Sequence, residues 1–300
     1  MFRISTNLMF DRSTTSMLRQ SSELLKTSQQ LSSGKRILTP SDDPSGAARA
    51  LALSQSIAIN DQMIRNQAYA QETMQLLEGT LAGVTENLQH LRERFIYGAN
   101  GTLSAADRQI IARELREQFG TLLALGNARD INGNYMFGGH ESNAPPFQGD
   151  LATGVTYVGD DGVREMRVSL SRDIGVTLPG QAVFGDLFAT VADFITALEG
   201  PVPEEGGLSV ALDRGISGLD RALDNVLNVR ARIGAHAVEL EQLGLISEET
   251  DLQLRTMLAN YQEIDYAEAI SRFARQQTML QAAQQTFMKI SGLTLFSYLQ

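Results

Sequence analysis

Proline is confined to a few places in this chain, and that distribution limits the possible folds more than any other feature. The seven prolines lie at positions 40, 44, 145, 146, 179, 201 and 203 of 300 residues. Residues 45–144 and 204–300 therefore contain none. Because proline breaks helices, long stretches without it are free to form long helices. The distribution indicates two helical arms joined by a middle segment of a different kind.

The first arm carries the clearest periodic pattern. From Ala70 to Phe95, apolar residues recur at alternating spacings of four and three, which is the a/d pattern of a helix that packs along its length. A helix of roughly 50 residues is about 75 Å long, which favours a bundle or coiled coil over a compact globule. The predicted bundle seam on this arm consists of Leu77, Leu81, Val84, Leu88, Leu91 and Phe95.

The second arm repeats the pattern from about residue 207. Its predicted seam consists of Leu212, Ile216, Leu219 and Leu223, which again follow the four-three spacing. A further helix is predicted from the capping run at Ser104 to about residue 129. Another capping run at Ser247 predicts that a helix starts or restarts there and continues towards the C-terminus.

The residue pattern of the middle segment, residues 131–205, is typical of a β-rich insert. It opens with the loop signals Asn132-Gly133-Asn134 and Pro145-Pro146. Two alternating stretches, 155–157 and 166–170, flank the turn residues 159–162, so we expect them to form one hairpin.

The two ends of the chain are weaker helix formers. Residues 1–34 contain twelve serines and threonines, and their narrow apolar stripe includes Leu24 and Leu31. A frayed amphipathic tail would explain this segment. The alternative is a helix that folds only when neighbouring chains cover its stripe. The C-terminal stripe, which we expect to serve assembly together with Leu24 and Leu31, consists of Leu280, Ala283, Phe287 and Ile290.

Composition argues against several classes of function. The net charge of −10 disfavours general nucleic-acid binding, and no apolar run is long enough for membrane insertion. The absence of cysteine removes thiolate chemistry, and the three histidines are scattered. We expect no catalytic residue, metal or other cofactor. The N-terminus does not resemble a secretory signal peptide.

These patterns together predict a mainly α fold: an elongated helical bundle or coiled-coil rod built from both chain ends, with a small inserted β-rich domain. Residues 1–43 and 255–300 would form a terminal coiled-coil assembly segment. Residues 44–130 and 206–254 would form the bundle, and residues 131–205 the outer domain.

Several motifs resemble the flagellin superfamily. At the N-terminal end these are residues 31–37 (LSSGKRI) and 41–48 (SDDPSGAA), and at the C-terminal end residues 264–270 (IDYAEAI) and 280–283 (LQAA). Residues 134–139 (NYMFGG) are similar to the branch of the superfamily that occupies the hook-filament junction.

The resemblance implies a structural subunit of the bacterial flagellum, not an enzyme, that forms an adaptor ring of copies at the junction. Implied partners are the chain itself, the hook-side junction protein, flagellin, the flagellar type III export apparatus and a cytoplasmic export chaperone. The location would be the extracellular flagellum, reached without a cleaved signal peptide. One alternative is a flagellin-type filament subunit, and another is an adhesin or enzyme carried on the β insert.

Overall fold

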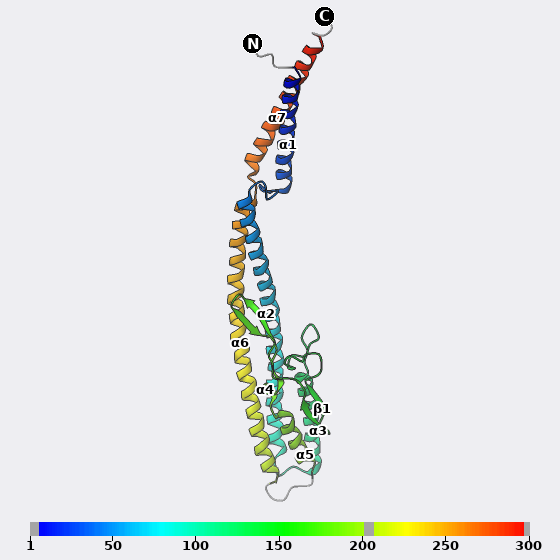
Figure 1. The fold of residues 1–300 in the computed structure, drawn as a ribbon. Coiled ribbons are helices and arrows are strands. Elements are labelled where there is room, and N and C mark those ends of the chain that lie inside the picture. The colour runs from blue at the N-terminus through cyan, green and yellow to red at the C-terminus, as the bar shows by residue number, and fades with distance from the viewer. Residues whose placement is uncertain (1–5, 201–206, 297–300) are drawn as a thin grey trace. The chain divides into compact units, whose positions relative to one another are not determined.

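The computed structural model describes residues 6–200 and 207–296, with side chains described for 8–200 and 207–289. Most of this part is helical (Figure 1). The helices are α1 (Thr6–Ser33), α2 (Pro44–Gly98), α3 (Ala105–Gly126), α4 (Gly180–Phe184), α5 (Leu187–Glu199), α6 (Gly207–Gln262) and α7 (Tyr266–Phe296). The strands are β1 (Phe147–Asp150), β2 (Gly154–Tyr157), β3 (Glu165–Ser169) and β4 (Arg172–Gly175). The mainly helical fold with a small β-rich insert is confirmed.

The chain divides into two compact units. Unit 1 consists of Met1–Asn60 with Thr250–Gln300, and unit 2 is Asp61–Glu249. Unit 1 thus holds α1, α7, the start of α2 and the end of α6. This division is coarser than the three segments expected from the sequence, whose boundaries stay predictions.

The core of unit 2 is built on the heptad seam of α2. The six predicted seam residues from Leu77 to Phe95 are at most 2% exposed. They share one apolar cluster with buried side chains of α3, α5 and α6, and the Phe95 and Phe194 rings stack with centroids 3.8 Å apart. On α6, Leu219 is buried, whereas Leu212, Ile216 and Leu223 are partly buried at the margin of the cluster.

The strands pair differently from our expectation. β1 pairs with β2 and β3 pairs with β4, both antiparallel, so the single hairpin predicted from 155–157 and 166–170 is wrong. The turn residues between β2 and β3 are held elsewhere. Asp160 Oδ1 accepts hydrogen bonds from the backbone N–H groups of His140 and Gly162, both at 2.8 Å. These contacts hold the turn against the preceding loop.

The C-terminal helices also break at a different place from the one predicted. α6 continues through Ser247, where we expected a helix to start, and ends at Gln262. Ser247 is 9% exposed, and its hydroxyl accepts a hydrogen bond from the side chain of buried Gln67 at 3.0 Å. The real start lies at α7, where Asp265 Oδ1 accepts from the N–H groups of Ala267 and Glu268. A carboxylate in this position caps a helix N-terminus.

Candidate assembly surface

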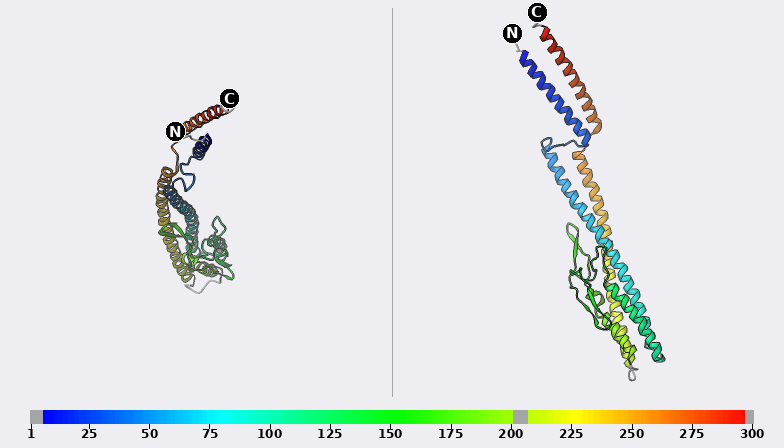
Figure 2. Two further views of the ribbon diagram at one scale, coloured as in Figure 1. Left: turned by 45° about the horizontal axis from the view of Figure 1, so that its top comes forward. Right: turned by 90° about the vertical axis from the view of Figure 1, so that its right-hand side faces the viewer.

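Unit 1 is organised around the antiparallel pair α1 and α7, which lie side by side in every view (Figures 1 and 2). Near one end, the rings of Phe10 and Phe287 meet edge to face with centroids 4.8 Å apart. Near the other end, the Ile264 N–H donates to the Gly34 carbonyl at 3.1 Å. These two contacts fix the register of the pair.

The assembly residues expected from the sequence lie along this pair. Leu24 and Leu31 on α1, and Leu280, Ala283 and Phe287 on α7, are partly buried. Ile290 lies within α7, but its side chain is outside the part of the chain that the structure describes. The first five therefore share one contact region, and their role in assembly stays a prediction.

Each helix of the pair presents two columns of seam residues. On α1, a large apolar column is followed by a column of small or polar residues, and both repeat every seven positions. α7 has the same arrangement. The large columns are Phe10, Met17, Leu24 and Leu31 on α1 and Phe273, Leu280 and Phe287 on α7. The other columns are Ser13, Gln20 and Thr27 on α1 and Ala269, Gln276 and Ala283 on α7. Only half of each seam is strongly apolar, so the pair buries less hydrocarbon than the seam of unit 2.

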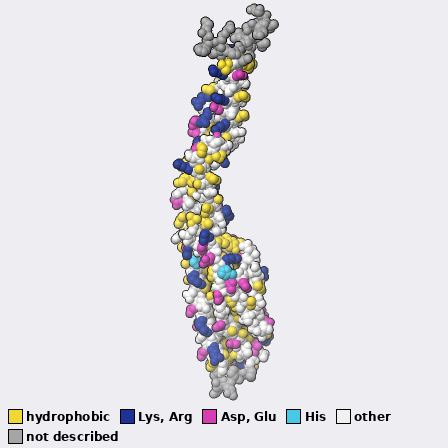
Figure 3. All heavy atoms as spheres, viewed as in Figure 1, with side chains coloured by type: hydrophobic (Ala, Val, Ile, Leu, Met, Phe, Trp, Pro, Cys, Tyr) yellow, Lys and Arg dark blue, Asp and Glu magenta, His cyan; other side chains and the backbone are white. Residues whose placement is uncertain are grey.

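Apolar side chains also lie on the outer faces of the pair. Leu18 and Leu25 on α1 are 66% and 61% exposed, and Ile270 and Met279 on α7 are each 57% exposed. Figure 3 shows hydrophobic side chains interspersed with charged ones on the face that it presents. Exposed apolar residues at helical spacing are suited to contact with further helices.

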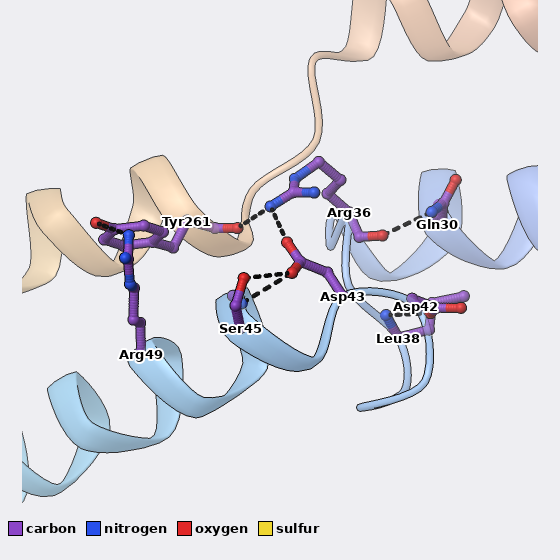
Figure 4. A network of polar contacts seen from close by, with 9 residues as sticks. Gln30, Arg36, Leu38, Asp42, Asp43, Ser45, Arg49 and Tyr261 are labelled. Atoms are coloured by element: carbon purple, nitrogen blue, oxygen red, sulfur yellow. Dashed lines mark hydrogen bonds and ion pairs between the residues drawn. The ribbon is translucent and has the colours of Figure 1, made fainter.

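Two connecting segments lie side by side: residues 34–43 between α1 and α2, and residues 263–265 between α6 and α7. Together they are called the elbow, and backbone contacts connect them. The Arg36 N–H donates to the Gln262 carbonyl at 2.7 Å, and Lys35 and Glu263 form an antiparallel bridge. From the last turn of α1, Gln30 Nε2 donates to the Arg36 carbonyl at 2.6 Å (Figure 4). The two connections, from α1 to α2 and from α6 to α7, are therefore held together.

Side chains reinforce the elbow (Figure 4). Arg36 Nη2 donates to the Tyr261 carbonyl at 3.0 Å and lies 3.3 Å from Asp43 Oδ2. Asp43 Oδ1 accepts from the Gly46 N–H at 2.9 Å, which caps α2. That bond, the Ser45 hydroxyl and the Arg36 guanidinium lower the pKa of Asp43.

Asp42 organises the loop before α2. Its Oδ2 accepts from the N–H groups of Leu38 and Thr39 at 3.1 and 3.0 Å, and its Oδ1 lies 2.6 Å from Lys26 Nζ. The hydrogen bond from Lys26, followed by the backbone bond from Thr39, lowers the pKa of Asp42 to about 2. The carboxylate is therefore ionised at neutral pH and fastens the loop to α1.

Gly34 terminates α1 in a conformation that other residues adopt at a cost. Its φ of +70° is in the left-handed region, and an added Cβ would lie 3.0 Å from the Tyr266 hydroxyl. A left-handed glycine after the last helical turn is the usual way to end a helix. Gly34 thus directs the chain from α1 into the elbow.

The elbow contacts between Arg36 and Tyr261 were not found by sequence reasoning. Arg36 and Tyr261 are 225 positions apart, and no local pattern connects them. The polar columns of α1 and α7 were missed for another reason. We sought apolar residues alone, whereas Ser13, Gln20 and Thr27 are spaced seven apart in the gaps of the apolar stripe.

No part of the described structure gathers an obvious metal site. Among the described residues, no group of three or more histidine, aspartate or glutamate side chains could hold an ion. His140 Nδ1 lies 3.5 Å from Asp160 Oδ1, and His236 Nδ1 lies 3.6 Å from Glu239 Oε2. Within the described ranges, no helix has an apolar stretch that could span a bilayer.

Comparison with known proteins supplies the class. Residues 4–142 match the model of the bacterial flagellin N-terminal helical region. The flagellar hook-associated protein 3 of Salmonella typhimurium is 33% identical over 315 aligned positions, which cover 98% of each chain. A filament 30.7 kDa core protein of Treponema maltophilum is 26% identical over 260 positions, 85% of this chain and 84% of that protein.

A solved structure agrees in fold. Hook-associated protein 3 of Legionella pneumophila superposes with a TM-score of 0.65 at 19% identity, covering 70% of this chain and 98% of that one. The fold and the sequence matches define a structural protein of the bacterial flagellum, of the flagellin type. Because the match to the Salmonella protein extends over nearly the whole of both chains, this chain belongs to the flagellar hook-associated protein 3 family.

Proposed function

We propose that this chain is the adaptor at the hook-filament junction of the flagellum and that copies of it form a ring there. The observation that carries the proposal is the end-to-end sequence match to a hook-associated protein 3. The α1–α7 pair, with its apolar outer residues, supplies the surface through which copies would join. In this role the chain works mechanically, because it transmits torque through contacts between helices.

The partners follow from that position. The ring would contact the hook-side junction protein on one side and flagellin on the other. Before assembly, the chain would pass through the flagellar type III export apparatus after a cytoplasmic chaperone has covered the apolar face of α7. Its final location would be the extracellular flagellum.

A subunit of the filament is the second candidate function, because a Treponema filament core protein also matches most of the chain at lower identity. An experiment separates the two. Purified subunits are incubated under conditions that polymerise flagellin and then imaged by electron microscopy. A junction adaptor forms rings or short oligomers and then stops, whereas long filaments from this protein alone would refute the junction role.

A matching cellular experiment tests the position. The chain is expressed in a bacterium that lacks its own junction protein and secretes flagellin into the medium. Restored filaments on the hooks support the proposal. Continued release of flagellin monomers, with the chain exported normally, would contradict it.

A further inference from the structure

Methionine is distributed unevenly over the exposed apolar surface of this chain. In unit 1, the exposed large apolar side chains include four methionines, and their exposed fractions are between 46% and 63%: Met9, Met257, Met279 and Met288. In unit 2, the exposed large apolar side chains among the described residues are leucine, isoleucine, valine and tyrosine, and none is methionine.

Unit 2 does contain methionines, but its fold covers them. Met74 and Met136 are each 2% exposed and belong to the main apolar cluster. Met63 and Met166 are partly buried. The difference between the units is therefore one of exposure, and the exposed thioethers lie only on the unit that carries the candidate assembly surface.

Methionine differs from the other apolar side chains in its chemistry with oxidants. A hydroperoxide such as hydrogen peroxide oxidises the thioether to a sulfoxide. The sulfur supplies two electrons and gains one oxygen atom, the O–O bond of the peroxide breaks, and its second oxygen leaves as water. Because the chain contains neither cysteine nor tryptophan, methionine is its most readily oxidised side chain.

The exposure of these methionines does not depend on pairing between α1 and α7. Met9 on α1 and Met279 and Met288 on α7 lie outside the seam columns, so they stay exposed when the two helices separate. Met279 borders a shallow hollow of α7 together with the small side chains of Ala274 and Ala282. A peroxide therefore reaches these sulfurs in the unassembled subunit, whether its terminal helices are paired or apart.

A sulfoxide would alter the surface that these side chains form. It replaces an apolar, flexible group with a polar one whose oxygen accepts hydrogen bonds. When another helix covers that oxygen without offering a donor, the contact loses apolar burial and leaves a polar atom unsatisfied. The buried methionines of unit 2 are protected from the same reaction, so its core would stay intact.

We propose that the exposed methionines of unit 1 are modification sites at which peroxide-type oxidants block assembly of the free subunit. The inference rests on the proposed function, in which unit 1 makes the contacts between copies. Oxidation acts before assembly, because contacts between copies cover the outer faces afterwards. A reductase that acts on methionine sulfoxide would restore the thioether and reverse the block.

The first test maps oxidation in the purified, full-length chain. The chain is treated with dilute hydrogen peroxide for increasing times, and mass spectrometry of its peptides measures the fraction of each methionine that has gained an oxygen atom. The four exposed methionines should react roughly tenfold or more faster than Met74 and Met136, which a peroxide reaches only through local unfolding. The melting of unit 2 should not change.

The second test connects the modification with assembly. A bacterium that lacks its own junction protein expresses the unchanged chain or a leucine variant, in which leucine fills a similar volume but resists oxidation. The leucine variant carries Met9→Leu, Met257→Leu, Met279→Leu and Met288→Leu. The matched control carries Met63→Leu and Met166→Leu in unit 2. Filaments are counted with and without sublethal peroxide, and each chain is compared with its own untreated level, so any effect of leucine itself cancels.

Peroxide should lower the filament count roughly tenfold for the unchanged chain and for the control, and much less for the leucine variant. If the fourfold variant is poorly expressed, Met279→Leu with Met288→Leu serves, with smaller protection in the same direction.

Three results would overturn the inference: buried methionines that oxidise as fast as exposed ones, equal losses for the unchanged chain and the leucine variant, or equal protection by the control. A chain that restores no filaments without peroxide would instead refute the proposed function. Full restoration followed by equal sensitivity to peroxide would refute this inference alone.

Discussion

A pair of glycines on α6 allows packing to be separated from helix propensity in unit 2. Gly215 is buried, and a Cβ built on it would lie 2.7 Å from Cε2 of Phe95. The Phe95 ring is fully buried and stacked on Phe194, so it has little room to move. Gly234 lies on the same helix, is exposed, and has nothing within 4 Å of the equivalent position.

Alanine at each position changes stability by amounts that can be worked out. Replacing a helical glycine with alanine stabilises the helix by about 1 kcal/mol, so Gly234→Ala should gain that amount. Gly215→Ala has the same gain, but overpacking a close-packed core costs about 1–3 kcal/mol. The propensity gain is common to both variants. Their difference in the free energy of unfolding therefore isolates the packing cost, and Gly215→Ala should be the less stable by about 1–3 kcal/mol.

The measurement is urea unfolding followed by circular dichroism, with thermal melting as a second readout. In a domain of 150–250 residues, 1 kcal/mol shifts the melting temperature by about 2–4 °C, so the two variants should differ by several degrees. Equal stabilisation by both alanines would refute the argument. It would mean that the aromatic stack accommodates a methyl group freely and that the core around Phe95 is not close-packed.

Three further predictions concern unit 1. Leu280→Asp places a charge on the α1–α7 seam and should abolish incorporation into flagella while leaving the melting of unit 2 unchanged. Normal flagella would contradict a role for this seam in assembly. The pKa of Asp42 is lowered from 3.8 to about 2, so its bonds to the loop are fully present above about pH 4 and are lost as the pH falls towards 2. NMR or hydrogen exchange of the loop should show loosening in that window, whereas Asp42→Asn should make the loop loose at every pH. Limited trypsin digestion of the free chain should cut at Lys35 and Arg275 before unit 2 is attacked, and equal resistance throughout would count against a weak terminal pair.

The helical part of the fold could be predicted because its signals are local and repeated. The α2 seam from Leu77 to Phe95 needs only the four-three spacing, and the structure buries all six of those residues. The start of α3 at Ala105 follows from the capping run at Ser104. Such features depend on neighbours within one or two helical turns, which the sequence displays directly.

The parts that were wrong or missed depend on distant contacts. The residues around Asp160 are typical of a hairpin turn. In the structure, however, the Asp160 carboxylate accepts a hydrogen bond from the His140 backbone, and β2 pairs with β1, the strand before it in the sequence. The Ser247 run has good capping chemistry, but burial against Gln67 keeps the helix continuous there. At the candidate surface, periodicity located the large apolar column. It did not locate the contact between Arg36 and Tyr261 at the elbow, because these two residues are 225 positions apart in the sequence.

The elbow also limits how the gene can vary in length. Its two connecting segments lie opposite each other at Lys35 and Glu263. One leads into the capped helix α2 and the other into the capped helix α7. One inserted residue in either segment would lengthen the path between the Lys35–Glu263 bridge and the cap of the following helix, so that the bridge and the cap could not both form as they do here. Insertions or deletions at the elbow should therefore be poorly tolerated. The turn at residues 151–153, between β1 and β2, has no such counterpart and should tolerate length changes alone.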